Sequence, residues 1–325
     1  MRRIPRRVVP LLPRLAAALA LLTGAAALAS ADEAFITEQS GGGVSVVDLV
    51  ARKTIAHIEI GGKPAGIAMS KDGATAFVTS TEGKFVTLID AASRRISGRI
   101  DMPDTPLGVA ADPAGRFLYV SGFYQPRIYK IDLETRVIIA TAEVGASPSG
   151  VAVSPDGGLI VVADRDDDAV SILDSGSFRS IAKVKTGAHP FGVTIDAKGA
   201  RVYTANVESN DISVIDLNTR ALIGTVPVGK RPYVVALAGR RGFSSDQYAG
   251  TVSAFDLETL QPIGRVSVGE YPEGLQASAD ESVVYVVNWF SNDVQAIDPK
   301  TLKVTAKIEV GDGPRSFGLF LRETR

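Results

Sequence analysis

The amino-acid sequence predicts a seven-bladed β-propeller, because three kinds of residue recur seven times along the chain at one spacing. The first is an aspartate that ends a segment of the form Val/Ile-x-x-hydrophobic-Asp. The second is a proline, which follows a glycine by three residues in six of the seven repeats. The third is an aromatic or apolar residue that recurs at the same spacing. Successive aspartates are 42 residues apart, except for one step of 40. The three series are Asp48, Asp90, Asp132, Asp174, Asp216, Asp256 and Asp298; Pro64, Pro106, Pro148, Pro190, Pro232, Pro272 and Pro314; and Phe35, Phe77, Tyr119, Val161, Tyr203, Phe243 and Tyr285.

Each repeat predicts four short antiparallel strands. After Pro64, strand-like apolar segments cover 66–69, 77–79, 85–89 and 96–100, and turn residues such as Asp72-Gly73 separate them. Four strands in a unit of about 42 residues are typical of one propeller blade.

The positions of the chain ends predict a closed ring. The mature chain is expected to begin within a second strand, at 34–37, and to end just after a first strand, at 314–321. The last segment therefore completes the first blade, and one sheet shared by both ends leaves no open blade edge. An open solenoid, the alternative, would leave an incomplete unit at each end.

The N-terminal segment has the features of a secretory signal peptide. A leader with five arginines precedes an apolar stretch at 15–28, and Ala29-Ser30-Ala31 forms a small-x-small cleavage site. We predict a signal peptide over 1–31, a single propeller domain over 32–325 and a periplasmic or secreted protein without a membrane span in its mature chain. An uncleaved anchor is the alternative. The paired arginines are compatible with export by either the Sec pathway or the twin-arginine pathway.

Composition narrows the classes of function. Cleavage after Ala31 removes five arginines and no acidic residue, which leaves 30 basic and 36 acidic residues. A mildly acidic chain does not attract phosphate backbones as a whole. The chain has no cysteine and two histidines, which provide no basis for a zinc, haem-attachment or thiol-redox motif. We expect no cofactor and no metal.

Two of the repeated series are interpreted as structural. Each aspartate stands before a turn, as in Asp132-Leu133-Glu134-Thr135, where its carboxylate can accept backbone N–H groups. A further series lies two residues after most prolines, where small residues would let neighbouring blades approach one another. This series is Gly66, Gly108, Gly150, Gly192 and Gly274, with Val234 and Ser316 in the remaining places.

The repeats resemble a known family. Tyr203-Thr204-Ala205-Asn206 and Tyr285-Val286-Val287-Asn288, each followed by the Asp segment and then by Gly-x-x-Pro, look like the YVTN-type β-propeller repeat. Within that family the chain is similar to propellers associated with PQQ-dependent alcohol catabolism and to periplasmic propellers with DNA affinity. More distantly it resembles the propeller subunits of quinoprotein amine dehydrogenases. The resemblance implies the propeller fold and leaves the function open.

Function is expected where the repeats differ. The Gly-x-x-Pro loops and the loops between the second and third strands meet on one rim of the axial channel, and their cations and aromatics predict a pocket for an anionic or aromatic ligand. A solvated rim of scattered charges is the alternative. The predicted site residues are Lys63, His189, Arg231, Tyr271, Glu273 and Arg315 from the first set, and Arg165 and Trp289 from the second.

No catalytic constellation is predicted. The run Arg165–Asp168 lacks the spaced ligands of a calcium loop, and neither His57 nor His189 has a serine and aspartate at a recognised spacing. The starts of the innermost strands offer one acidic residue, Glu273, which argues against lactonase or phytase chemistry. Blade six is two residues short and carries Lys230, Arg231, Arg240 and Arg241, either as a docking patch or as a tolerated deletion.

Three functions remain as hypotheses. The first is an exported binding or accessory protein in PQQ-linked oxidation, whose partner would be a periplasmic dehydrogenase, a cytochrome c or a small anionic ligand. The second is a nucleic-acid or polyanion binder that uses the basic rim. The third is a non-catalytic propeller subunit of an amine dehydrogenase-like complex.

Overall fold

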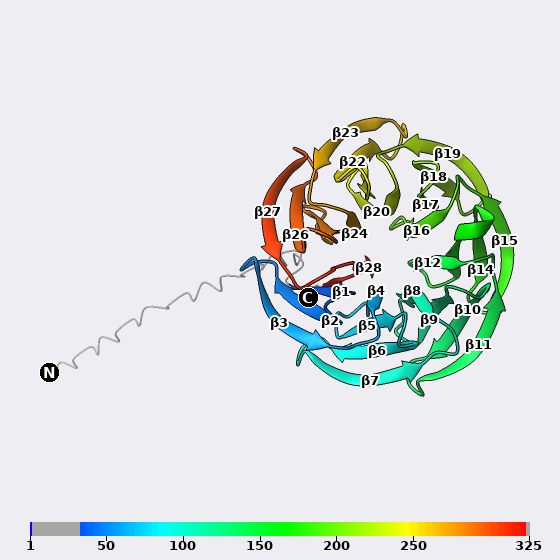
Figure 1. The fold of residues 1–325 in the computed structure, drawn as a ribbon, viewed down its shortest axis with the longest axis horizontal. Coiled ribbons are helices and arrows are strands. Elements are labelled where there is room, and N and C mark those ends of the chain that lie inside the picture. Colours follow the sequence, from blue (N-terminus) through cyan, green and yellow to red (C-terminus); the bar gives the residue numbers. More distant parts are fainter. Residues whose placement is uncertain (2–32, 323–325) are drawn as a thin grey trace.

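Seven blades surround a central axis in the computed structural model, which describes Met1 and residues 33–322 (Figure 1). The propeller predicted from the repeat is therefore confirmed. Apart from Met1, the signal peptide predicted over 1–31 lies outside the described residues. None of the helical structure within the described part of the chain has the length and apolar character of a membrane span.

Each blade is a sheet whose strands follow the chain outward from the axis. Blade one contains β29 (Leu321–Arg322), β1 (Glu33–Glu38), β2 (Gly43–Asp48) and β3 (Lys53–Glu59). Blade two contains β4 (Pro64–Met69), β5 (Thr75–Ser80), β6 (Phe85–Asp90) and β7 (Arg95–Asp101), with β28 (Phe317–Gly318) added beside β4. Blade three contains β8 (Pro106–Ala111), β9 (Phe117–Gly122), β10 (Arg127–Asp132) and β11 (Val137–Glu143).

The remaining four blades repeat this order. Blade four contains β12 (Pro148–Val153), β13 (Leu159–Asp164), the 3-10 helix η1 (Arg165–Asp167), β14 (Ala169–Asp174) and β15 (Arg179–Lys185). Blade five contains β16 (Pro190–Ile195), β17 (Arg201–Asn206), β18 (Asp211–Asp216) and β19 (Ala221–Pro227). Blade six contains β20 (Pro232–Ala238), β21 (Arg241–Asp246), β22 (Thr251–Asp256) and β23 (Pro262–Ser267). Blade seven contains β24 (Pro272–Ala277), β25 (Val284–Asn288), β26 (Asp293–Asp298) and β27 (Lys303–Glu309).

The two chain ends share blade one, as predicted. β29 pairs antiparallel with β1, and Pro314 forms a further bridge to Glu38. Thr37 and Ser316 also exchange hydrogen bonds, from the Thr37 N–H to Ser316 Oγ (3.0 Å) and from the Ser316 N–H to Thr37 Oγ1 (2.7 Å). The closure thus uses many backbone and side-chain contacts and no covalent bond.

The closing segment differs from the single continuous strand that the sequence predicts. Between Pro314 and β29, the short strand β28 leaves β1 and pairs in parallel with β4 of the next blade. Ser316 has a φ of 48° and Gly318 a φ of 129°, which bend the backbone on both sides of Phe317. This bend carries the Phe317 side chain into the packed cluster near the axis.

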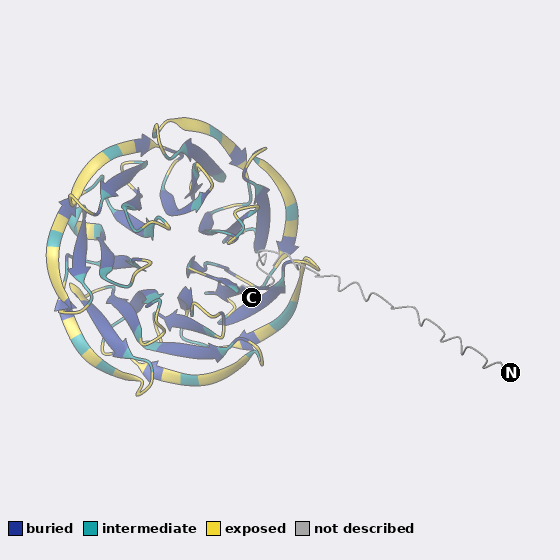
Figure 2. Ribbon diagram, turned by 180° about the vertical axis from the view of Figure 1, so that it is seen from behind, coloured by how far each residue is buried: buried dark blue, intermediate teal, exposed yellow. Residues whose placement is uncertain are grey.

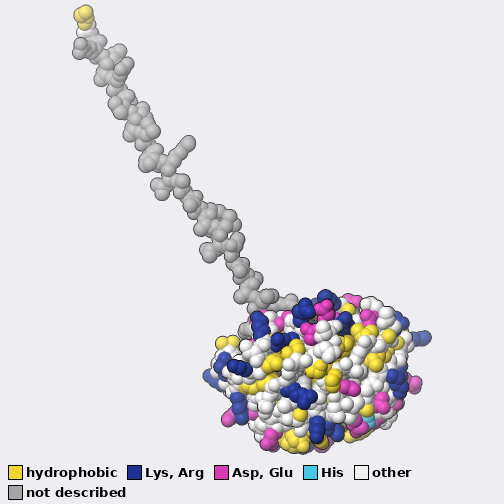
Figure 3. Space-filling view, turned by 90° about the horizontal axis from the view of Figure 1, so that it is seen from above, with side chains coloured by type: hydrophobic (Ala, Val, Ile, Leu, Met, Phe, Trp, Pro, Cys, Tyr) yellow, Lys and Arg dark blue, Asp and Glu magenta, His cyan; other side chains and the backbone are white. Residues whose placement is uncertain are grey.

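Burial falls from the inner strands to the outermost strand of each blade (Figure 2). The inner strands pack between blades and form the hydrophobic clusters, whereas the outermost strands alternate exposed and partly buried residues. Several exposed apolar side chains on these outer strands lie between charged residues along the edge of the disc (Figure 3). Dispersed apolar side chains of this kind are ordinary on a protein surface.

The repeated aspartates fix turns, as predicted. The N–H of the third residue after each aspartate donates to its carboxylate, for example from Thr135 to Asp132 Oδ1 at 2.8 Å and from Ser177 to Asp174 Oδ1 at 2.7 Å. Backbone and hydroxyl hydrogen bonds from Thr135 hold the pKa of Asp132 below its usual value. The carboxylates therefore stabilise local turns and are not a ring of free ligands.

The second glycine series brings the innermost strands together, which confirms the expected close approach of the blades. A Cβ placed on Gly66 would lie 2.1 Å from the Leu107 carbonyl oxygen, and one on Gly108 would lie 2.0 Å from that of Ser149. No side chain fits at such a distance from the backbone of the next blade. The glycines consequently set how tightly the blades converge on the axis.

Replacement of Gly108 by alanine tests this constraint. We expect Gly108→Ala to lower the free energy of unfolding by about 3 kcal/mol, because the new methyl group must displace backbone of blade four. Urea denaturation measures the change. The control is Gly176→Ala, where the nearest atom lies 3.6 Å from the new Cβ and the change should stay below about 1 kcal/mol. Similar effects of the two substitutions would contradict the packing argument.

Candidate functional site

The two predicted sets of loops meet on one face of the disc, which we call the proline-loop face. The carbonyl of the residue before each proline accepts the N–H of the first residue after the second strand. Examples are Trp289 N–H to the Tyr271 carbonyl and Gln247 N–H to the Arg231 carbonyl, both at 2.9 Å. These bonds join the two loops of each blade into one surface.

A buried residue at the end of the second strand supports each Gly-x-x-Pro loop. In blade six, a Cβ added to Gly229 would lie 2.4 Å from Asp246 Oδ2, so only glycine fits beside this carboxylate. Asp164 has the same place in blade four, and Asn206 and Asn288 have it in blades five and seven. Burial raises the pKa of Asp164 to about 6, and its Oδ1 has no hydrogen-bond partner among the described residues.

Four of the predicted site residues occupy one strained backbone position. Lys63, His189, Arg231 and Tyr271 stand directly before their prolines with φ values of 59°, 56°, 54° and 54°. Positive φ is uncommon for residues other than glycine and is maintained only where the surrounding structure demands it. The loop hydrogen bonds just described supply that constraint.

Glu273 and Arg315 lie behind the rim and not on it, which corrects their expected position. They follow their prolines and turn toward the axis, and the Glu273 side chain is fully buried. Glu273 accepts from Arg315 Nε at 2.5 Å, from Arg315 Nη2 at 3.1 Å and from Gln247 Nε2 at 2.6 Å. Both carboxylate oxygens are therefore used within the protein.

The charge of Arg315 is likewise matched inside the molecule. Its Nη2 donates to the Tyr233 hydroxyl at 2.7 Å, and its guanidinium lies 4.6 Å from the centre of the Trp289 ring. Burial opposes the charge, but Glu273 and Tyr233 outweigh it and raise the pKa of Arg315. Arg315 consequently connects the buried centre of the propeller to the aromatic residues of the rim.

One residue from each blade occupies the place after the proline, next to the axis. Together these are Ala65, Leu107, Ser149, Phe191, Tyr233, Glu273 and Arg315. The Phe191 ring lies 4.2 Å from that of Tyr233 and 4.8 Å from that of Phe317, centre to centre. Because β16 and β28 belong to different parts of the ring, the contact between Phe191 and Phe317 crosses the axis. We call Leu107, Phe191, Tyr233 and Phe317 the axial plug.

Four aromatic residues of blades six and seven form a continuous patch on the proline-loop face. We call Tyr248, Tyr271, Trp289 and Phe290 the aromatic patch. Tyr271 lies 5.4 Å from Tyr248 and 4.4 Å from Phe290, and Trp289 lies 5.0 Å from Phe290. Tyr248 and Phe290 are each 55% exposed. The patch thus presents a broad apolar surface to solvent.

Arg231 extends the aromatic patch. Its guanidinium lies 4.7 Å from the centre of the Tyr248 ring, and its buried Nε has no hydrogen-bond partner among the described residues. Of the eight predicted residues, the structure brings Arg231, Tyr271 and Trp289 together here, with Glu273 and Arg315 beneath them. Tyr248 was not predicted, although it lies in one of the loops that the sequence singled out.

The other predicted residues lie apart from the patch. His189 Nδ1 is 3.2 Å from Glu208, Arg165 Nε is 2.7 Å from Asp166, and Lys63 is exposed. The rim is therefore a mixture of paired charges around one aromatic region, and the eight residues do not form a single pocket.

The basic residues of blade six do not form one patch either. Lys230 and Arg231 lie on the proline-loop face, whereas Arg240 and Arg241 lie at the turn between β20 and β21 on the opposite face. Arg240 is 2.5 Å from Glu258, and Arg241 donates to the carbonyls of Pro299 and Lys300. This separation rules out the docking patch that the four residues would form together.

Comparisons with known proteins support the fold. The family described as Lactonase, 7-bladed beta-propeller, matches residues 132–224, from the end of blade three into blade five. The chain is similar to "Kuenenia stuttgartiensis Hydrazine Synthase" (TM-score 0.73, 20% identity, 80% of this chain and 90% of that chain). It is also similar to a functionally unknown protein from Desulfotomaculum acetoxidans DSM 771 (TM-score 0.76, 15% identity, 88% and 99%). No curated protein matches in sequence. Likeness at these identities establishes a shared propeller fold alone.

The raised pKa of Asp164 predicts a pH-dependent stability. The folded protein binds this proton more tightly than the unfolded chain, so the contribution of Asp164 to stability falls as pH rises from about 4 to about 6. We therefore expect the free energy of unfolding of Asp164→Asn, relative to that of the wild type, to rise by about 2–3 kcal/mol between pH 4 and pH 8. Urea denaturation at both pH values measures it. Asp156→Asn is the control: hydrogen bonds from Ser154 and Gly158 lower the pKa of Asp156, so its contribution to stability is lost only below about pH 4, and its difference from wild type should stay nearly constant between pH 4 and pH 8. A constant difference between Asp164→Asn and wild type would refute the assignment.

The buried ion pair between Arg315 and Glu273 predicts that loss of one partner strongly destabilises the protein. Glu273→Gln should lower the free energy of unfolding by about 3 kcal/mol, because it leaves the Arg315 charge uncompensated away from water. Glu258→Gln, which breaks the exposed pair with Arg240, should change stability by about zero. Thermal unfolding of both variants compares the two pairs directly. A small effect at Glu273 would mean that water reaches Arg315.

Proposed function

We propose that this propeller is a binding protein that docks a partner protein on the aromatic patch and serves an extracytoplasmic, quinoprotein-linked oxidation. The observation that carries the docking proposal is the exposed aromatic surface beside Arg231 and above Arg315. Aromatic residues and arginine supply most of the binding free energy at protein interfaces.

Several features of the patch favour a protein over a small ligand. The rings of Tyr248 and Phe290 stand more than half exposed, and the Arg231 Nε lacks an acceptor within residues 33–322. Their backbones are held by the paired loops, so little conformational freedom is lost on binding. A preordered apolar surface with an unmet donor matches a partner that brings apolar groups and a carbonyl or carboxylate oxygen.

The charged residues of the proline-loop face argue against the two alternative ligands, a small anion and a polyanion. Arg315, Arg165 and His189 each have a carboxylate within 3.2 Å, so a small anion or a polyanion would have to displace an existing partner. The buried pair of Arg315 and Glu273 supports the rings above it and does not present a free charge. Docking of a protein requires none of these pairs to break.

The resemblance to exported YVTN-type propellers supports the choice of partner. A periplasmic dehydrogenase or a cytochrome c is the expected partner, and the signal peptide predicted over 1–31 would bring the propeller to the same compartment. The third alternative, a subunit of an amine dehydrogenase-like complex, would use the same surface with a more permanent partner.

Binding measurements with patch variants test the proposal. The tagged mature protein is used to isolate partners from a periplasmic extract of its native host, and the affinity of each purified candidate is then measured by calorimetry. We expect Phe290→Ala and Tyr248→Ala each to weaken binding about 30-fold, which corresponds to about 2 kcal/mol.

Tyr124→Ala is the matched control for these variants. Tyr124 is an aromatic residue on the same face that is 71% exposed and lies outside the patch, so its loss should leave the affinity unchanged. Recovery of no dehydrogenase or cytochrome c, or equal binding by the Phe290→Ala variant, would contradict the proposal.

A further inference from the structure

A large cavity opens on the face opposite the proline loops. Its volume is about 1030 Å³, and it is lined by residues of the innermost strands of blades two to seven together with Gly318 and Leu319 of the closing segment. The fifth residue after each of the seven repeated prolines is aliphatic and lines the cavity. These residues are Met69, Ala111, Val153, Ile195, Leu237, Ala277 and Leu319. We call this cavity the apolar cup.

The axial plug closes the inner end of the apolar cup. Its residues precede the cup residues along the same strands, so they lie deeper in the molecule, toward the proline-loop face. Phe191, Tyr233 and Phe317 are each at most 8% exposed and pack ring against ring. The apolar cup is therefore a blind cavity that is separate from the aromatic patch.

The shortened blade six lowers one wall of the cup. In blade two, residues 70–74 join the two inner strands, whereas in blade six only Gly239 and Arg240 do so. The missing residues would stand at the mouth of the cup, where Gly239, Arg240 and Leu257 now line the cavity. The shorter connection therefore stands at the mouth of the cup.

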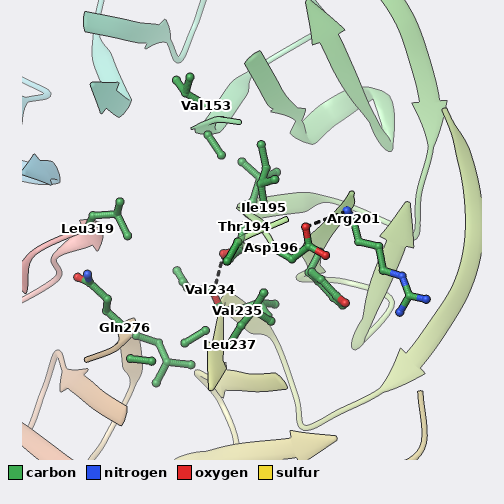
Figure 4. A pocket seen from close by; sticks show the side chains of 18 of the residues that line it. Val153, Thr194, Ile195, Asp196, Arg201, Val234, Val235, Leu237, Gln276 and Leu319 are labelled. Atoms are coloured by element: carbon green, nitrogen blue, oxygen red, sulfur yellow. Dashed lines mark hydrogen bonds between the residues drawn. The ribbon is translucent and has the colours of Figure 1, made fainter. Parts of the chain in front are cut away.

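Gln276 is the principal polar side chain that faces the interior of the cup (Figure 4). Its Oε1 accepts from the backbone N–H groups of Phe320 at 2.6 Å and Leu321 at 3.0 Å, which fixes the orientation of the amide. Its Nε2 has no acceptor within residues 33–322 and remains available as a donor. Thr194, another polar residue of the lining, already donates its hydroxyl to the Val235 carbonyl at 2.6 Å.

From these features we propose that the apolar cup is a binding site for a neutral, mostly apolar small molecule with one hydrogen-bond acceptor, such as a carbonyl oxygen. Aliphatic side chains from all seven blades receive the apolar body of the ligand, and Gln276 Nε2 donates to its acceptor. A charged molecule is disfavoured, because the innermost strands that surround the cavity contribute no charged side chain to its lining. The charged residues of the lining stand in turns or at strand ends next to turns: Asp196, Lys198, Arg201, Asp216, Arg240, Glu258 and Glu281. This site is independent of the proposed docking surface.

A polarity-sensitive dye tests the site. The probe is 6-propionyl-2-dimethylaminonaphthalene, which is neutral and apolar, carries one ketone and emits at shorter wavelength in apolar surroundings. We expect saturable binding to the mature protein, weakened at least about tenfold in Leu319→Lys and in Ala152→Trp, since Ala152 lines the cup next to Val153. Leu319 is 58% exposed, so its substitution leaves folding intact, and melting temperature verifies this. Gln276→Glu retains the acceptor for the backbone N–H groups but loses the donor, and should weaken binding similarly.

Two controls assign the dye to the cup. Leu222→Lys makes the same change at a leucine that is 43% exposed on β19, on the outside of the ring, and should leave binding unchanged. Phe290→Ala should also leave it unchanged, because the aromatic patch lies beyond the axial plug. Absence of saturable binding, retention of binding in Leu319→Lys and Ala152→Trp, or loss of binding in Phe290→Ala would each overturn the proposal.

Discussion

The close contact between glycine Cα atoms and the carbonyls of the next blade sets the radius of the ring. Where Gly66, Gly108 and Gly150 meet their neighbours, the distances leave no room for a side chain. The innermost strands therefore converge so far that the side chains one residue earlier must share the axis. Aromatic rings fill that space, and a buried ion pair and its hydrogen-bond partners fill the rest. The division of the molecule into two faces with separate surfaces is a consequence of this convergence.

The segment that closes the ring also contributes to both candidate sites. The chain between Pro314 and Arg322 supplies Arg315 to the buried pair, Phe317 to the axial plug and Leu319 to the apolar cup, before β29 completes blade one. Arg322 and Arg94 then hold Glu33 at 2.6 Å each. Closure and formation of the two candidate sites are thus coupled, because the segment that joins the ends also shapes both.

The repeat predicted the blades, the shared sheet at the ends, the aspartate turns and the face on which the variable loops meet. It did not show that Glu273 and Arg315 turn inward, because a charged residue after a proline looks the same in sequence whether it meets water or a buried partner. The apolar cup was missed for a related reason. Met69, Val153 and Leu237 look like ordinary core residues of strands, and only the three-dimensional arrangement shows that these positions face the axis. Blade six was recognised as short, but the effect of the deletion depends on the cavity beneath it.

Ordered water along the axis in a high-resolution crystal structure tests the central claim most directly. If the plug separates the two faces, no water will lie between the rings of Phe191, Tyr233 and Phe317, and the solvent near Trp289 will end above them. A continuous file of water molecules from Trp289 to Leu319 would contradict the separation. The two surfaces would then belong to one open channel, and the independence of the docking patch and the cup would be lost.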